Sequence, residues 1–285
     1  MVNTIRGDTK VLGVIGNPIE HSFSPQIHNT ICKCLKLPYT YVPFHVMEEN
    51  LQDAIKGLCA LSVQGFNVTI PHKNSIMQYL NGVSEEARLI GAVNTVKNVA
   101  GKLYGYNTDG NGFIRSLKKY NVDVKGKNIL ILGAGGAARA VAVKMAIEQA
   151  KCITILNRTV DKAKEICEVI NTHIVDIANS DVFSSENVSR YGQRVDIIVH
   201  TTPIGMYPNI EANPVEQLAF LKEDIVVCDL IYNPPKTVLL KETEKSGCLS
   251  INGWGMLIYQ AVNAFEIWTG EKVSNDVIYQ LYKLL

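Results

Sequence analysis

Short apolar runs alternate with amphipathic segments along the chain, and this alternation predicts a series of strands and helices. The runs Lys10–Gly16, Tyr39–His45 and Val63–Ile70 have the composition and length of strands. Between the last two, Met47–Leu61 carries apolar side chains at helical spacing with charged residues between them, which is typical of an amphipathic helix. The pattern therefore predicts β-α units in this part of the chain.

The same region continues with a short helix and a hairpin. The helix is expected at Ser84–Ile90, and strands are expected at Gly91–Val96 and Leu103–Tyr106, the second of them after a hairpin turn. Pro71, which ends the third strand, is expected to begin a helix, and a further helix is expected to run to about Tyr120.

A second β-α series begins at Asn128–Leu132, where four consecutive aliphatic residues predict a strand buried on both faces, as in a parallel sheet. The later expected elements are an alanine-rich helix to Gln149, strands at Cys152–Leu156, Val195–His200 and Ile225–Leu230, and helices at Val160–Ile170 and Leu257–Trp268. Residues 171–193 give no clear pattern. Two successive α/β series predict an α/β protein of two domains with a cleft between them.

One serine-rich turn admits two interpretations. Ser24 followed by Pro25 predicts a helix start, with Ser24 as the N-cap, ahead of a helix at Gln26–Leu35. Alternatively, the hydroxyls of Ser22 and Ser24 bind a carboxylate near the N-terminus of that helix. Ser22 has no structural role in the first interpretation, and both interpretations stay open.

Composition narrows the class of protein. The 285-residue chain has a net charge of +1, which gives no support for nucleic-acid binding. No apolar run approaches the roughly 20 residues that span a membrane, and residues 1–10 lack the apolar stretch of a signal peptide. The seven cysteines form no C-x-x-C pair and the six histidines no H-x-x-x-H arrangement. Reduced thiols, a cytoplasmic location and no metal site are therefore expected.

A glycine turn follows the strand at Asn128–Leu132. The sequence Gly133-Ala134-Gly135-Gly136-Ala137-Ala138 stands between this strand and the alanine-rich helix. In that setting G-x-G-x-x-G/A is typical of dinucleotide binding, because the helix N-terminus faces the pyrophosphate. A structural turn without a ligand is the alternative.

The strand after this helix indicates which dinucleotide is bound. Cys152–Leu156 is followed by Asn157, Arg158 and Thr159, and no carboxylate stands where an NAD site places one for the ribose hydroxyl. An arginine between two small polar residues suits a 2′-phosphate. Taken alone, Arg158 is more typical of a solvated loop, but its position after the second strand of this series favours NADP.

Motifs spread over nearly the whole chain resemble those of the shikimate dehydrogenase family. They are Gly16–Pro25, Asn67–Lys73, Gly91–Thr95, Asn107–Gly110, Gly133–Arg139, Asn157–Thr159, Thr202–Met206, Asp229–Tyr232 and Asn252–Ala261. The resemblance implies reversible, NADP-dependent oxidation of shikimate to 3-dehydroshikimate in aromatic amino-acid biosynthesis. It also implies a substrate domain of residues 1–107 plus 253–285 and a Rossmann-like NADP domain of residues 108–252. A monomer and a homodimer both stay open.

The resemblance assigns roles to single residues. The residues implied to bind substrate are Ser22, Ser24, Thr69, Asn94, Tyr232 and Gln260, with Lys73 and Asp109 as catalytic residues that also contact the ring hydroxyls. The residues implied to bind cofactor are Gly133, Ala134, Gly135, Gly136, Ala137, Asn157, Arg158 and Thr159, with Gly253 and Met256 at the nicotinamide.

The chemistry of alcohol oxidation independently favours Lys73 and Asp109. Hydride leaves the carbon to the cofactor, so another group must take the hydroxyl proton. A lysine in a partly dry cleft can do this, and Asp109 can hold it in place. The alternatives are a solvated lysine in a first helical turn and an Asx turn at Asp109.

The sequence departs from the family's commonest pattern at Phe23, His72 and Trp254, which puts fine substrate specificity in doubt. Three other functions stay open: a quinate dehydrogenase or an enzyme of broader specificity, a non-catalytic NADP-sensing protein, and another two-domain dehydrogenase. Arg158 argues against the first, and the presence of both Lys73 and Asp109 argues against the second.

Overall fold

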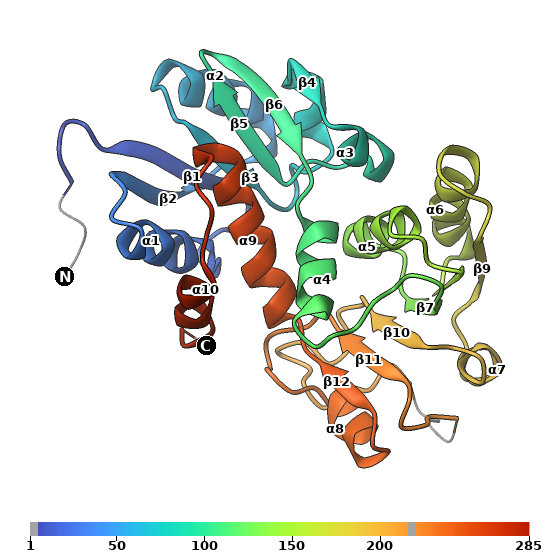
Figure 1. The fold of residues 1–285 in the computed structure, drawn as a ribbon. Helices are drawn as coiled ribbons and strands as arrows, with labels where there is room; N and C mark the ends of the chain where they lie inside the picture. Colours follow the sequence, from blue (N-terminus) through green and yellow to red (C-terminus); the bar gives the residue numbers. More distant parts are fainter. Residues whose placement is uncertain (1–4, 216–219, 285) are drawn as a thin grey trace. The chain divides into compact units, whose positions relative to one another are not determined.

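The computed structural model describes residues 5–215 and 220–284 and is drawn in Figure 1. Its contacts divide the chain into two compact units, Met1–Gly112 with Ile258–Leu285, and Phe113–Leu257. Both boundaries fall inside helices, α4 (Asp109–Lys118) and α9 (Trp254–Thr269). The assignment of a substrate domain and a cofactor domain with the ranges given above stays a prediction.

The first unit is built on a six-stranded sheet in the order β2-β1-β3-β5-β6-β4. Its strands are β1 (Lys10–Gly16), β2 (Tyr39–His45), β3 (Gly65–Val68), β4 (Gly82–Val83), β5 (Thr95–Val99) and β6 (Lys102–Tyr106). Strand β1 is parallel to β2 and β3, whereas β5 is antiparallel to both of its neighbours. The helices are α1 (Ser24–Cys34), α2 (Leu51–Ala60), α3 (Glu85–Ile90), α10 (Asn275–Tyr282) and the 3-10 helices η1 (Glu48–Asn50) and η2 (Ser75–Tyr79).

Helices pack on both faces of this sheet. On one face, Ile55 and Leu58 of α2 join a buried apolar cluster with Phe66 of β3. On the other face, the ring of His28 in α1 stacks on that of Tyr41 in β2, with centroids 4.3 Å apart. The alternation of side chains along each strand thus supplies both layers of the core.

The second unit is a six-stranded sheet in which every pair is parallel, in the order β12-β11-β10-β7-β8-β9. Its strands are β7 (Asn128–Leu132), β8 (Cys152–Asn157), β9 (Ala178–Val182), β10 (Ile197–His200), β11 (Val226–Asp229) and β12 (Leu249–Ile251). Its helices are α5 (Gly136–Ile147), α6 (Val160–His173), α7 (Ser185–Gly192) and α8 (Val238–Lys245).

This strand order is that of the doubly wound dinucleotide fold, in which the winding reverses between the first and fourth strands. Here the reversal lies between β7 and β10. Figure 1 shows these two strands and the helix α5 that follows the first of them. The expectation of an α/β protein with a Rossmann-like second sheet is confirmed.

Two expectations about local structure are wrong. Pro71 lies within a series of turns, and the next helix is the short 3-10 helix η2, so Lys73 does not lie in a first helical turn. The strand expected at Gly91–Val96 begins only at Thr95. The reason is that Gly91 ends α3 in a left-handed conformation, with φ +71°.

Candidate active site

The first unit holds a lysine–aspartate ion pair. Nζ of Lys73 lies 2.7 Å from Oδ2 of Asp109, and the two side chains are 29% and 13% exposed. A pair with little solvent around it is screened less than one on the open surface. The structure thus brings together the two residues for which the sequence predicts proton transfer.

Asn94 holds the other oxygen of this carboxylate. Its Nδ2 donates to Oδ1 of Asp109 at 2.7 Å and to Oγ1 of Thr108 at 3.0 Å. Its Oδ1 accepts from the N–H of Thr108 and from Oγ1 of Thr95, both at 2.9 Å. These bonds occupy both donors and both lone pairs of the amide. Asn94 is therefore a positioning residue for Asp109, and its contact with substrate stays a prediction.

Loops after strands put the ion pair in place. The carbonyl oxygen of Lys73 accepts from the N–H of Val93 at 2.8 Å. The N–H of Asp109 donates to Oδ1 of Asn107 at 3.0 Å, and Nδ2 of Asn107 donates to the carbonyl of Ala92 at 3.0 Å. The sequence assigned no role to Asn107. Its signal is the position two residues before Asp109, from which an Asn side chain reaches a backbone N–H.

The start of helix α1 differs from the helix start that the sequence predicts. Helix α1 begins at Ser24, and the N-cap position is held by Phe23, whose backbone is already helical (φ −78°, ψ −11°). Ser24 is therefore not the N-cap, and that expectation is wrong. Instead, Oγ of Ser22 accepts from the N–H of Ser24 at 3.3 Å. Both side chains are half-buried, and carboxylate binding stays a prediction.

Thr69 and Gln260 lie in the same unit. A Cβ atom on Gly16 would lie 2.3 Å from Cγ2 of Thr69, so Thr69 packs closely on the end of β1. A Cβ atom on Gly112 would lie 2.6 Å from the backbone nitrogen of Gln260, so α9 packs closely on the start of α4. Gln260 is thereby placed beside the helix that Asp109 begins.

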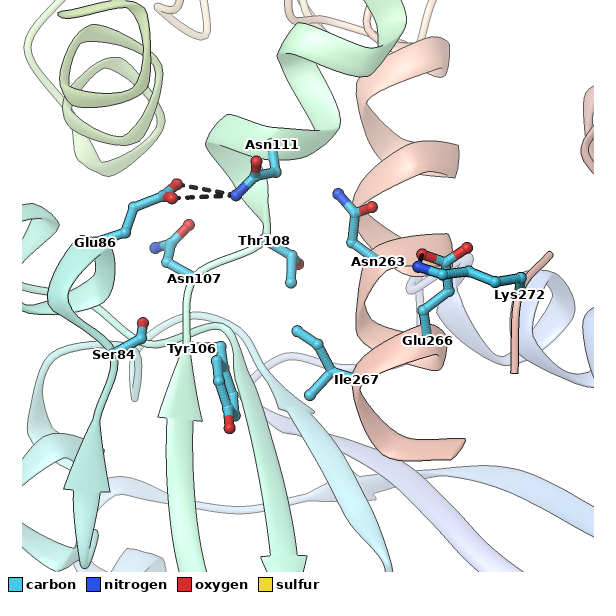
Figure 2. A pocket seen from close by; sticks show the side chains of 10 residues that line it. All are labelled: Ser84, Glu86, Tyr106, Asn107, Thr108, Asn111, Asn263, Glu266, Ile267 and Lys272. Atoms are coloured by element: carbon cyan, nitrogen blue, oxygen red, sulfur yellow. Dashed lines mark hydrogen bonds and ion pairs between the residues drawn. The ribbon is translucent and has the colours of Figure 1, made fainter. Parts of the chain in front are cut away.

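A polar pocket of about 390 Å³ opens beside the loop that carries Asp109 (Figure 2). Asn107 and Thr108 line it, and Asn111 donates to both carboxylate oxygens of Glu86 at 3.1 and 3.2 Å. The other lining residues are Ser84, Tyr106, Asn263, Glu266, Ile267 and Lys272. No residue that the sequence predicts for substrate or cofactor is among these lining residues.

In the second unit a glycine turn joins β7 to α5. Gly133 adopts φ +112°, and a Cβ atom on it would lie 2.5 Å from Oγ1 of Thr201, so this position requires glycine. A Cβ atom on Gly135 or Gly136 would meet nothing within 4 Å. The N-terminus of α5 therefore faces open space, and its first turn carries no acidic residue. This arrangement fits the pyrophosphate of a dinucleotide.

The other residues predicted to bind the adenosine half of the cofactor lie near the same edge of the sheet. Ala134 and Ala137 flank the open glycines and are half-buried. Asn157 ends β8, and its Nδ2 donates to the carbonyl of Thr159 at 2.9 Å. Arg158 is exposed, and no described residue forms a hydrogen bond or ion pair with its guanidinium. An available guanidinium after the second strand fits a 2′-phosphate.

Three predicted residues follow the strands β11 and β12. The ring centroids of Tyr232 and Trp254 lie 4.9 Å apart. Burial raises the pKa of Tyr232, so its hydroxyl stays protonated and can donate a hydrogen bond. A Cβ atom on Gly253 would lie 2.1 Å from the carbonyl oxygen of Leu230, so close packing of two loops requires this glycine. Met256 is half-buried near the start of α9.

Two kinds of feature are absent from the part of the chain that the structure describes. No group of three or more His, Cys, Asp or Glu side chains is placed to hold a metal ion. No helix there is long and apolar enough to cross a membrane. The expectation of no metal site stays a prediction.

Three sequence profiles match the chain one after another. The profile described as "Shikimate dehydrogenase substrate binding domain" matches residues 14–96. "Shikimate / quinate 5-dehydrogenase" matches residues 116–236, and "Shikimate 5'-dehydrogenase C-terminal domain" matches residues 253–281.

Whole-chain comparisons find relatives of nearly equal length. The chain is 52% identical over 278 residues to the shikimate dehydrogenase (NADP(+)) of Methanocaldococcus jannaschii, which covers 96% of both chains. The structure of the present chain is similar to that of shikimate 5-dehydrogenase from Listeria monocytogenes in complex with shikimate and NAD, with a TM-score of 0.95, 36% identity and 99% of each chain covered. It is also similar to a shikimate dehydrogenase in complex with NADP+, with a TM-score of 0.88, 50% identity and coverage of 98% of this chain and 96% of that one.

Proposed function

Because the chain belongs to the shikimate dehydrogenase family, we propose that it catalyses the reversible, NADP-dependent interconversion of shikimate and 3-dehydroshikimate. The observation that carries this proposal is the Lys73–Asp109 ion pair, with Nζ and Oδ2 2.7 Å apart. A family member without catalysis would have no need to keep both groups in contact. The reaction belongs to the shikimate pathway of aromatic amino-acid biosynthesis.

Lys73 is the group that exchanges a proton with the reacting hydroxyl. In the oxidation direction the alcohol loses a hydride from carbon, which the nicotinamide of NADP accepts, and a proton from oxygen. In its amine form Lys73 takes that proton and becomes the ammonium ion of the pair with Asp109, and in the reverse direction the ammonium returns the proton to the carbonyl oxygen. Asp109 receives a hydrogen bond from Lys73 and fixes where Nζ points.

The remaining side chains of the first unit orient the substrate. The half-buried hydroxyls of Ser22 and Ser24 lie at the start of α1 and hold the carboxylate, a task that suits a helix N-terminus. Thr69 and Gln260 bind ring hydroxyls, and Asn94 acts there through Asp109. Tyr232, which remains a phenol, donates to the carboxylate.

The second unit holds the cofactor. The backbone at Gly135 and Gly136, where a side chain would meet nothing within 4 Å, receives the pyrophosphate, and Arg158 receives the 2′-phosphate. Gly253 and Met256 would line the site of the nicotinamide. Free thiols at the described cysteines support a cytoplasmic location. We infer that the enzyme works there as a monomer or a homodimer.

An NADP-linked assay with shikimate and quinate side by side tests this function. We expect the higher kcat/KM with shikimate, because the extra tertiary hydroxyl of quinate needs room beside the carboxylate that Ser22 and Ser24 hold. Ser22→Ala should raise the KM for shikimate more than it lowers kcat, as expected for lost binding that is equal in ground and transition states. A higher kcat/KM with quinate would contradict the substrate assignment. NADP binding without turnover of either compound would contradict catalysis.

A further inference from the structure

Two polar side chains are fully buried at the carboxyl edge of the second sheet. His200 ends β10 and Asp229 ends β11, and the two residues are paired in register. Both are 0% exposed. Burying an imidazole beside a carboxylate costs free energy unless every polar atom has a hydrogen-bond partner. The partners of these two side chains therefore indicate what role they have.

Every polar atom of the two side chains has a partner. Nδ1 of His200 lies 2.9 Å from Oδ1 of Asp229, and because a carboxylate only accepts, Nδ1 carries the proton. Nε2 lies 2.5 Å from Oγ1 of Thr202. On the other side, Oγ1 of Thr237 donates to Oδ2 of Asp229 at 2.6 Å. We call this group the edge network, and its members are His200, Thr202, Asp229 and Thr237.

The edge network shapes the loops that follow both strands. Oγ1 of Thr202 accepts from the N–H of Ile204 at 3.3 Å, which fixes the turn after β10. Oδ1 of Asp229 accepts from the N–H of Ile231 at 3.1 Å, which fixes the turn after β11. Thr237 also accepts from the N–H of Leu240 at 3.4 Å and so caps helix α8.

The network also lies directly against the glycine turn. Oγ1 of Thr201, between two network residues in sequence, donates to the carbonyl of Leu132 at 2.9 Å. A Cβ atom on Gly133 would lie 2.9 Å from Cγ2 of Thr202. The network therefore lies where the order of strands reverses, between β7 and β10. Dinucleotides bind outside the carboxyl ends of the strands at this point.

We propose that the edge network positions the loops that hold the nicotinamide half of the cofactor. A doubly wound sheet consists of two mononucleotide-binding halves. The half from β7 to β9 carries the glycine turn and Arg158, which serve the adenosine end, and the half from β10 to β12 carries the network. His200 and Asp229 have no exposed surface, so they act through the loops and not by contact with the cofactor.

Two ligands separate this role from a merely structural one. NADP+ contains both halves of the cofactor, whereas adenosine 2′,5′-bisphosphate contains the 2′-phosphate and lacks the nicotinamide. Titration calorimetry of the ligand-free protein measures both dissociation constants without any turnover. In Asp229→Asn, an amide NH2 group replaces one carboxylate oxygen, and this group cannot accept a hydrogen bond from its neighbour. We expect the Kd for NADP+ to rise about tenfold, and the Kd for adenosine 2′,5′-bisphosphate to stay within about twofold.

Thr243→Val is the matched control. Thr243 is 0% exposed, lies in the same unit and shares a hydrogen bond of 2.8 Å with Ser250, away from the carboxyl edge. This variant should lower the Tm and leave both dissociation constants unchanged. If Asp229→Asn weakens both ligands equally, or neither, the network only stabilises the fold and the proposal is wrong.

A second variant covers the case in which Asp229→Asn does not fold. His200→Asn keeps a donor where Nδ1 stands and removes the partner of Thr202, so the Kd for NADP+ should rise at least about threefold. An unchanged Kd in the folded variant would overturn the proposal. The inference rests on the proposed use of NADP: a parent protein that binds no NADP+ contradicts that function, whereas equal affinities in parent and variants contradict the network alone.

Discussion

Asp109 is fixed before any substrate arrives. Each carboxylate oxygen accepts from one side chain, Oδ2 from Lys73 and Oδ1 from Asn94, both at 2.7 Å. The backbone N–H of the same residue is held by Asn107. Fixed donors and acceptors of this kind reduce the reorganisation that the reaction requires. The direction of Nζ of Lys73 is therefore determined by the fold of the first unit.

Arg158→Ala tests the assignment of the 2′-phosphate. Because no described residue forms a hydrogen bond or ion pair with the exposed guanidinium, its loss should leave the fold intact. Losing one charge-assisted phosphate contact costs about 1.5–3 kcal/mol, so the KM for NADP should rise about tenfold or more while that for NAD changes little. Arg194→Ala is the control, since this exposed arginine precedes β10 at the opposite edge of the sheet. Equal effects of Arg158→Ala on both cofactors would refute the assignment.

His28 makes the stability of the fold depend on pH. It is 0% exposed and neither ring nitrogen makes a hydrogen bond of normal geometry in the described structure. Burial lowers the pKa of His28 from 6.5 to about 3, and the amide of Asn67 offsets only part of this shift. The unfolded chain therefore takes up a proton below pH 6.5 that the folded chain does not. The contribution of His28 to stability is complete above pH 6.5 and is lost as the pH falls towards 3.

His28→Phe should remove this dependence while keeping the ring that stacks on Tyr41. Guanidinium unfolding at pH 7.5, 6 and 5 measures it. The free energy of unfolding of the parent should fall by up to about 1.4 kcal/mol per pH unit more than that of the variant. Parallel curves for the two proteins would show that His28 does not titrate as its burial requires.

At the scale of elements, the apolar pattern predicted the buried strands, but it did not predict the helices and strands that consist mainly of polar residues. Strands β1, β2 and β7 lie where the sequence predicted them, and the aliphatic residues of β1 and β7 are mostly buried. The edge strand β9 (ANSDV) and the helix α7 (SENVSRYG) lie in the stretch that gave no pattern. Their backbones are ordered by neighbouring β8 and by the cap of Ser184 on Asn187, which single-sequence periodicity does not contain.

The sequence predicted which residues form the candidate site, but not how their side chains are arranged. Lys73 and Asp109 are 36 positions apart in the sequence, so their contact depends on the pairing of strands that no local pattern fixes. For the same reason, the sequence did not show that the side-chain amide of Asn94 is fully hydrogen-bonded, or that Asn107 holds the backbone N–H of Asp109. The edge network was missed because the sequence places His200 and Asp229 near the ends of two expected strands but does not show that these two positions pair in register.

The glycine turn offers a contrast between two neighbouring glycines. Gly133→Ala would place a Cβ atom 2.5 Å from Oγ1 of Thr201 at φ +112°, so the free energy of unfolding should fall by about 1–3 kcal/mol. Gly135→Ala meets nothing within 4 Å, so stability should change by less than about 1 kcal/mol. Its added methyl group occupies the space expected for the pyrophosphate, and the Kd for NADP+ should rise. An unchanged Kd in Gly135→Ala would place the cofactor elsewhere.

For the whole molecule, the family and the α/β fold that the sequence predicted are confirmed by profiles across the chain and by solved structures of similar fold. The two units carry different tasks in the proposed reaction. The acid/base pair belongs to the first unit, and the glycine turn belongs to the second. Substitutions in the pair should therefore change turnover and leave the affinity for NADP+ nearly unchanged.

The most direct test is the kcat of Lys73→Ala, Asp109→Ala and the double variant, with Lys97→Ala as a control. Lys97 is a partly buried lysine of the same unit whose Nζ donates to the carbonyl of Ile267 at 2.6 Å, so its loss should affect stability and not kcat. General acid/base catalysis contributes about 10²–10⁴-fold, so Lys73→Ala should lower kcat by that factor. If the pair acts as one unit, the double variant should be barely slower than the slower single variant. A kcat of Lys73→Ala within a few-fold of the parent, or effects of the two substitutions that multiply, would contradict the mechanism.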